Sequence, residues 1–102
     1  MELHVHAPGL HAEEARIREQ IAHAIKHYEE RLTRVEVFLR DVNGAKGGVD
    51  KHCVVEARPR GLDPVAAEAN GADAVEAAAN AAQKLGRLLQ SKFGRLGDHR
   101  PH

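Results

Sequence analysis

The sequence predicts an α+β fold in which a four-stranded mixed sheet carries two helices on one of its faces. Several short segments alternate apolar and polar residues, which indicates strands buried on one side only. Two longer segments repeat their apolar residues every three or four positions, as amphipathic helices do. Along the 102 residues these segments follow the order β-α-β-β-β-α.

The first two predicted elements are a strand and a helix. Residues 2–7 alternate apolar and polar side chains, and Pro8-Gly9 ends the strand. Residues 12–32 carry apolar side chains at helical spacing, with two glutamates in the first turn, where the helix dipole favours acids. We therefore expect a first helix from Ala12 to Leu32.

Three more strands and a second helix complete the chain. Alternation predicts strands around residues 34–40, 52–58 and 65–69, and helical spacing of apolar side chains predicts the helix at residues 72–96. Asn-Gly and Gly-Gly pairs within residues 41–50 supply the positive φ values of a hairpin loop. Because a helix connects the first two strands, they are expected to be parallel, and the later strands to form an antiparallel meander.

One face of the predicted sheet lies away from both helices. We expect this face to be polar and open to water because the apolar side chains of each strand point the other way. Its predicted members are Glu2, His4, His6, Arg34, Glu36, Phe38, Arg40, His52, Val54, Glu56 and Arg58.

The composition describes one domain and excludes several classes of protein. The length of 102 residues and the apolar content of 42% predict a single domain over residues 1–96, with a flexible tail at residues 97–102. No apolar run approaches the ~18 residues of a membrane span, and the first ten residues do not resemble a signal peptide. The single cysteine, Cys53, fits a buried site in a reducing compartment. We expect a cytoplasmic protein.

The sequence offers no catalytic or cofactor site. His23 and His27 are four residues apart, but no glutamate stands between them in the HExxH pattern and no third ligand follows at a suitable spacing. Ser91, the only serine, has no base beside it in the pattern of a nucleophile. We expect no enzyme activity, no metal or other cofactor, and no small-molecule substrate.

Charge is balanced over the whole chain but unevenly distributed. Fifteen basic and fifteen acidic residues cancel, yet residues 81–102 carry a net charge of +4 and the rest −4. On the second helix, Lys84, Arg87, Lys92 and Arg95 fall within one arc opposite the apolar stripe. Such a row either binds phosphate groups or is a solvated surface near a helix C-terminus, where the dipole favours cations.

Two segments carry a resemblance to a known family. They are residues 35–57, with Asp-Val-Asn-Gly-Ala-Lys-Gly-Gly at their centre, and the helical pattern Lys84-Leu85-x-Arg87-x-x-Leu89. They resemble the ribosome hibernation-promoting factor and ribosome-associated inhibitor family, also known as sigma-54 modulation proteins. The resemblance extends from the first strand to Leu96.

The resemblance implies both a fold and a function. The fold would be similar to a double-stranded-RNA-binding domain. The protein would bind the small (30S) ribosomal subunit in the channel for messenger and transfer RNA, inhibiting translation and stabilising idle ribosomes under stress. A short form of this family is expected to act as a monomer, without its own domain for pairing ribosomes.

The resemblance and the charge pattern together select eight cations as contacts to 16S rRNA. Contacts to phosphate and sugar would recognise the shape of the RNA more than its sequence. The alternative is a protein-interaction or regulatory module of the same fold with weak or no ribosome affinity, which the neutral net charge favours. The eight predicted RNA-binding residues are Arg18, Lys26, Lys46, Lys51, Lys84, Arg87, Lys92 and Arg95.

Overall fold

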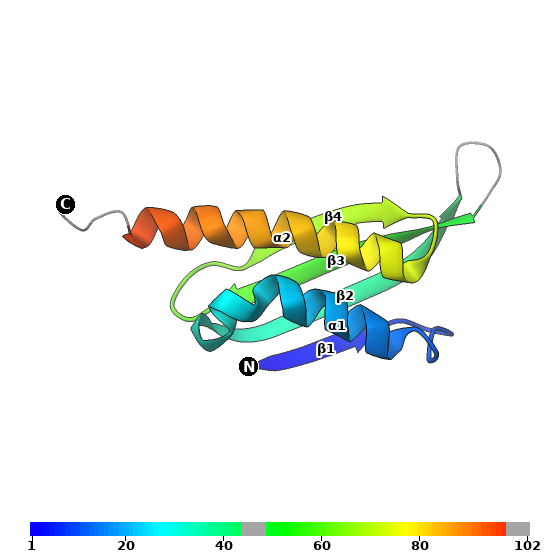
Figure 1. The fold of residues 1–102 in the computed structure, drawn as a ribbon, viewed down its shortest axis with the longest axis horizontal. Helices are drawn as coiled ribbons and strands as arrows, with labels where there is room; N and C mark the ends of the chain where they lie inside the picture. The colour runs from blue at the N-terminus through cyan, green and yellow to red at the C-terminus, as the bar shows by residue number, and fades with distance from the viewer. Residues whose placement is uncertain (44–48, 98–102) are drawn as a thin grey trace.

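A computed structural model describes residues 1–43 and 49–97. Its elements follow the predicted order, with a short 3₁₀ helix added after the first helix (Figure 1). They are β1 (Glu2–His6), α1 (Glu14–Ile25), the 3₁₀ helix η1 (Lys26–Arg31), β2 (Leu32–Asn43), β3 (Val49–Pro59), β4 (Val65–Gly71) and α2 (Ala74–Gly97).

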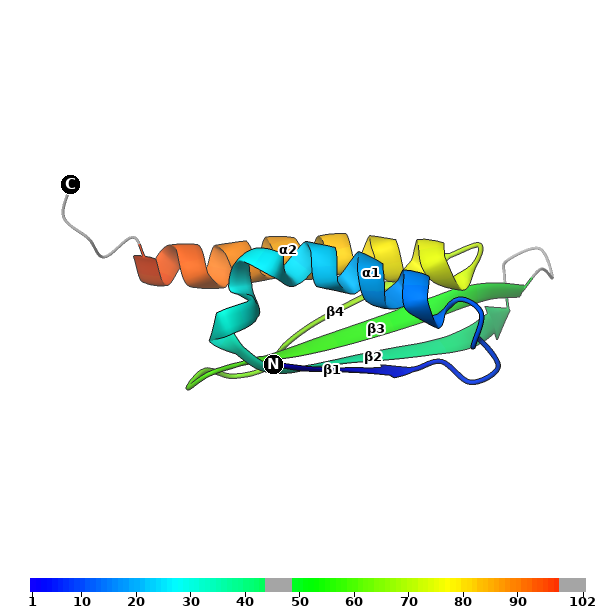
Figure 2. The same cartoon turned by 60° about the horizontal axis from the view of Figure 1, so that its bottom comes forward.

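The four strands form one mixed sheet in the order β1-β2-β3-β4. β1 and β2 are parallel, whereas the β2–β3 and β3–β4 pairs are antiparallel, as predicted. One register row across the sheet joins Val5, Val37, Val55 and Ala67. Both helices cover the face to which these side chains point, and the other face is open (Figure 2). The predicted α+β architecture is therefore confirmed.

The core lies between this sheet face and the two helices. From α1 it takes Ile17, Ile21 and Ile25, which are almost completely buried. From the middle of α2 it takes Leu85 and Leu89, both fully buried. Burial of each such side chain stabilises the fold by about 1.5–3 kcal/mol. The first half of α2 contributes alanines, which allow the helix backbone to approach the sheet closely.

The first helix is shorter than predicted. The α-helical turns end at Ile25, and residues 26–31 form η1. Leu32, predicted as the last residue of the helix, is the first residue of β2 and is fully buried. The ring of Tyr28 stacks on Phe93 with their centroids 5.4 Å apart. Leu32 and Tyr28 thus reach the core from a strand and a tight turn, although their spacing continues the helical pattern.

The hairpin loop is also shorter than predicted. The ladder continues through the pairs Asp41–Lys51, Val42–Asp50 and Asn43–Val49, and all of these residues except Lys51 lie within the predicted loop. The remaining residues, 44–48, lie outside the described residues, and so does the predicted contact Lys46.

The second helix begins two residues later than predicted because its first turn is capped. The Glu76 amide donates to Asp73 Oδ1 at 2.8 Å, and the Ala72 amide donates to Glu76 Oε1 at 3.2 Å. This reciprocal pair satisfies two amides at the helix start. The helix continues to Gly97, which was predicted to belong to the tail, and residues 98–102 are outside the described part of the chain.

Candidate nucleic-acid interface

Two cations of α2, Lys84 and Lys92, lie on the side of the helix that faces β4. Lys84 is exposed, and its Nζ donates to the carbonyl oxygen of Glu68 on β4 at 3.1 Å. Lys92 is half-buried and donates to the carbonyl oxygen of Asp63, just before β4, at 3.2 Å. Arg87 lies between these two lysines in the sequence, and its side chain is exposed. We call Lys84, Arg87 and Lys92 the α2 row.

None of the three cations in the α2 row forms an ion pair with any residue that the structure describes. Two of them are held by neutral carbonyl groups, and the side chain of Arg87 has no hydrogen bond within residues 1–43 and 49–97. The positive charge of the row is therefore available to an anionic ligand. Arg95 lies farther along α2, and its contact with RNA stays a prediction.

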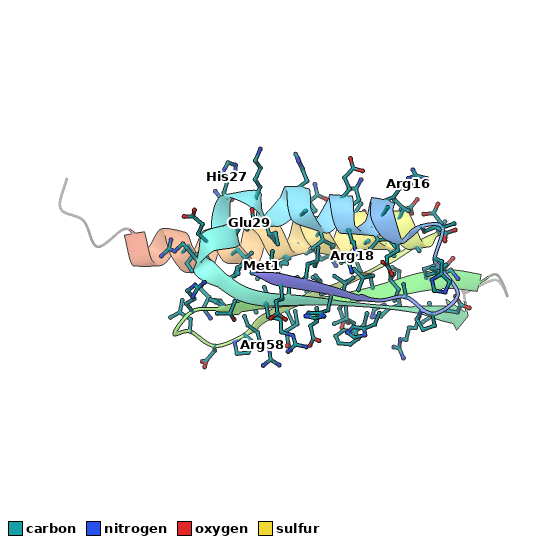
Figure 3. The ribbon with its side chains drawn as sticks, turned by 90° about the horizontal axis from the view of Figure 1, so that it is seen from below. Met1, Arg16, Arg18, His27, Glu29 and Arg58 are labelled. Atoms are coloured by element: carbon teal, nitrogen blue, oxygen red, sulfur yellow. The ribbon has the colours of Figure 1, made fainter. Side chains whose placement is uncertain are left out.

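The cations of α1 lie at the opposite edge of the helix layer. Arg18 Nη1 donates to the carbonyl oxygen of Leu3 on β1 at 3.0 Å, and its Nε lies 3.4 Å from Glu14 Oε2. Figure 3 shows Arg18 between α1 and β1, with Arg16 pointing away from the sheet. Lys26 is exposed at the start of η1. Arg18 and the α2 row thus border the helix layer on its two sides.

A shallow groove between α1 and α2 separates these two groups of cations. Its volume is about 420 Å³, and no charged lysine, arginine, aspartate or glutamate lines it. The helices come close at Gly86, where a Cβ atom would lie 3.6 Å from the carbonyl oxygen of Ala24. The groove is lined by Gln20, His23, Ala24, Ala79, Asn80, Ala82, Gln83 and Gly86.

Lys51 lies in a different environment from the α2 row. It forms an ion pair with Asp41 across the β2–β3 ladder. It also borders a pocket near the start of α2 that is lined by Arg16 and by three acids, Glu13, Asp73 and Glu76. These acids neutralise much of the local positive charge, so the structure does not bring Lys51 together with the cations of α2.

Two arginines near the C-terminal half of α2 were not predicted. The guanidinium carbon of Arg31 lies 4.1 Å from the centroid of the Phe93 ring. Arg60 Nε donates to the carbonyl oxygen of Glu30 at 3.1 Å. Both arginines border a pocket with Leu62, which also lines the pocket beside Lys92. They come from turns that only the tertiary fold brings together, so periodicity along the sequence gives no signal for them.

The open face of the sheet is polar, as predicted, and its glutamates are paired. Glu36 is partly buried, which by itself raises the pKa of its carboxyl group. Arg34 Nη2, 3.0 Å from Glu36 Oε1, and His6 Nε2, at 3.5 Å, outweigh this effect and lower the pKa below its usual value. A hydrogen bond from His4 likewise lowers the pKa of Glu2. Arg58 projects from this face, away from the helices (Figure 3).

Groups for covalent or metal chemistry are not gathered at a site in the described part of the chain. Cys53 is buried, and the loss of solvent raises the pKa of its thiol to about 12. Among residues 1–43 and 49–97, no three histidine, cysteine, aspartate or glutamate side chains are grouped to hold a metal ion. No helix in the same residues is long and apolar enough to cross a membrane.

Comparison with known proteins adds a family and two related folds. The family described as sigma 54 modulation protein / S30EA ribosomal protein matches residues 5–96. A ribosomal subunit interface protein from Coxiella burnetii superimposes with a TM-score of 0.74 and 14% identity, over 92% of this chain and 99% of that one. The N-terminal domain of Thermus thermophilus Protein Y gives a TM-score of 0.60 and 13% identity, over 89% and 94%. No curated protein matches the sequence.

Proposed function

Because the chain belongs to the family of sigma 54 modulation and S30EA ribosomal proteins, we propose that this ribosome-associated protein binds the small (30S) subunit in the channel for messenger and transfer RNA. There it inhibits translation and stabilises idle ribosomes. The observation that carries this proposal is the α2 row, whose cations face no acidic partner among the described residues. The proposed role is binding without catalysis.

The positions of Lys84 and Lys92 favour phosphate binding. An ammonium group has three N–H donors, and each of these lysines uses one on a backbone carbonyl. Two donors on each lysine remain for a phosphate. Since a side chain held in place before binding loses less conformational entropy, each such lysine saves part of the ~0.5–1.5 kcal/mol that ordering it would cost.

The two edges of the helix layer would contact different parts of the 16S rRNA. Arg18 and Lys26 lie on the α1 side, and the α2 row lies on the β4 side, with the uncharged groove between them. Two separated lines of cations match two segments of phosphate backbone better than a single anion. Recognition of this kind reads RNA shape through phosphate and sugar.

Arg87 gives the cleanest test because its side chain makes no hydrogen bond or ion pair within the described residues. Purified 30S subunits are sedimented with the protein over a series of salt concentrations. The wild-type protein should dissociate steeply as salt rises. The Arg87→Ala variant should reduce the slope of log affinity against log salt by about 0.7–0.9, the contribution of one phosphate contact.

A double charge reversal, Lys84→Glu with Arg87→Glu, should abolish co-sedimentation. Arg58→Glu is the matched control, because Arg58 projects from the opposite side of the sheet. Since Lys84 also binds a β4 carbonyl, urea unfolding of each variant must show that the domain still folds. Unchanged sedimentation of the folded double variant would refute the assignment of the α2 row.

The regulatory module without ribosome affinity remains the second candidate. Arg18 and Lys51 each pair with a carboxylate, from Glu14 and Asp41 respectively, and this lowers the charge that they present to RNA. If this candidate is right, the wild-type protein should fail to sediment with 30S subunits even at low salt. The same experiment therefore decides between the two functions.

A further inference from the structure

One aromatic pair interrupts the polar face of the sheet. Phe38 on β2 and His6 on β1 are register partners, and their rings stack with centroids 4.7 Å apart and planes inclined by 7°. Phe38 is 42% exposed, although it lies on an inner strand of the sheet. It contributes nothing to the core, which lies on the other side of the sheet.

The acids that surround this pair have partners. Each lies beside an arginine or a histidine, at N···O distances of 2.8–3.9 Å. The pairs are Glu2 with His4, Glu36 with Arg34, Glu56 with Arg58, and Glu68 with His52. The remaining acid on this face, Asp50, lies farther along the ladder toward the hairpin, opposite Val42.

Arg40 differs from the other arginines of this face. It is exposed, follows Phe38 on the same side of β2, and forms no ion pair with the described residues. Its register partner His52 lies within hydrogen-bonding distance of the side chain of Asn70 on β4. An unpaired cation, an exposed aromatic ring and polar hydrogen-bonding groups therefore adjoin one another.

We propose that this open face is a second RNA site, which binds single-stranded RNA with a nucleobase stacked on the Phe38–His6 pair and a phosphate on Arg40. Bases of single strands stack on aromatic side chains, and this stacking tolerates many sequences. The site goes beyond the proposed ribosomal function and uses none of the α2 row, which lies on the opposite side of the sheet.

The size and charge of the patch favour a nucleobase over a protein partner. Phe38 and its register partner Val54 are the apolar side chains at its centre, and charged residues surround them. The centre of a protein interface is depleted in charge and needs a larger apolar area. A single base is about the size of one aromatic side chain, and Arg40 complements the charge of its phosphate.

The test uses the full chain and a fluorescent oligoadenylate of about ten nucleotides, within the usual site size of single-strand binders. Fluorescence anisotropy should show that Phe38→Ala weakens binding by about 5- to 150-fold, the range expected for one stacked base. Phe38→Leu, which keeps an apolar side chain but removes the ring, should weaken binding as well. Leu88→Ala is the matched control and should bind the oligoadenylate with unchanged affinity, because Leu88 is an equally exposed apolar side chain on α2, on the other side of the sheet.

A tryptophan in place of Phe38 reports directly on the stacking of a base. The chain contains no tryptophan, so the emission of Phe38→Trp comes from this site alone. Oligoadenylate should quench this emission while binding stays at least as tight as in the wild type. Because Phe38 is exposed, all three variants should fold, and urea unfolding checks that they do.

Three results would overturn the proposal. Phe38→Ala could bind the oligoadenylate as well as the wild type, or the emission of Phe38→Trp could stay constant at saturating RNA. The third is self-association of the wild type that Phe38→Ala abolishes, with RNA binding unchanged, since this would make the patch a contact between two copies. If Arg87→Glu loses 30S binding but keeps oligoadenylate binding, the two RNA sites are independent, as proposed.

Discussion

Replacement of Gly71 by alanine should destabilise the protein more than the same change at Gly86 or Gly94. Gly71 is buried at the end of β4, where the first turn of α2 passes over it. An added Cβ atom would lie 2.4 Å from the Ala77 amide nitrogen and 2.8 Å from Ala77 Cα. Both are backbone atoms, so no side-chain rotation relieves the contact, and either β4 or α2 must move.

The magnitude of this effect follows from the atoms that would collide. Overpacking in a dense core costs about 1–3 kcal/mol. A shift of the helix start also disturbs the cap formed by Asp73 and Glu76, and a cap is worth about 1 kcal/mol. The reduced entropy of the unfolded chain offsets about 0.4–1 kcal/mol. We expect a net loss of about 2 kcal/mol, which lowers the Tm of a domain of this size by about 8–16 °C.

Urea unfolding of Gly71→Ala, followed by circular dichroism, measures this loss. Gly86→Ala and Gly94→Ala are the matched controls, since a Cβ atom meets only an ordinary contact at Gly86 and nothing within 4 Å at Gly94. Both lie within α2, where alanine gains up to about 1 kcal/mol over glycine. A Gly71→Ala variant as stable as the wild type, with an unchanged m-value, would refute the steric argument.

Two further predictions concern titratable groups. The thiol of Cys53 is buried, and its pKa is raised to about 12. At about pH 8 it should therefore react with a thiol reagent only at the rate of global unfolding, whereas in urea it should react rapidly. Because the folded-state pKa of Glu36 is lowered, its stabilising contribution is present above its ordinary pKa and is lost as pH falls through the lowered value. Glu36→Gln should therefore reduce stability at pH 7 and flatten the acid side of the plot of unfolding free energy against pH. Urea unfolding at a series of pH values measures this plot, with the exposed Glu19→Gln as control. An unchanged plot for Glu36→Gln would contradict the prediction.

The sequence was sufficient to predict the order and pairing of the strands because each strand shows its apolar residues on one face only. It was not sufficient to predict where elements end. Leu32 continues the helical spacing of α1 but is buried from β2, because the chain turns through η1 to enter the sheet. The β2–β3 ladder continues to Asn43 and Val49 because backbone pairing does not require the apolar alternation on which the prediction rested.

For the candidate site, helical spacing placed Lys84 and Arg87 on one exposed side of α2, and the structure agrees. Their contacts could not be predicted, because the Glu68 carbonyl that Lys84 binds is brought to it by the packing of β4 beneath α2. The same holds for Arg31, whose contact with Phe93 joins residues far apart in the sequence. Phe38 was correctly placed on the open face, but its stacking on His6 depends on the parallel register of β1 and β2.

A net charge of zero does not prevent an RNA contact at the α2 row, because charges act over a short range in salt. At physiological ionic strength the Debye length is about 8 Å. Acids on the open face, such as Glu2 and Glu56, are separated from the outer side of α2 by the sheet and by a helix about 10 Å across, which is more than one Debye length. They are also paired with His4 and Arg58. The charges that a phosphate at Arg87 experiences are those of its own side of the molecule, where the α2 row has no ion-pair partner among the described residues.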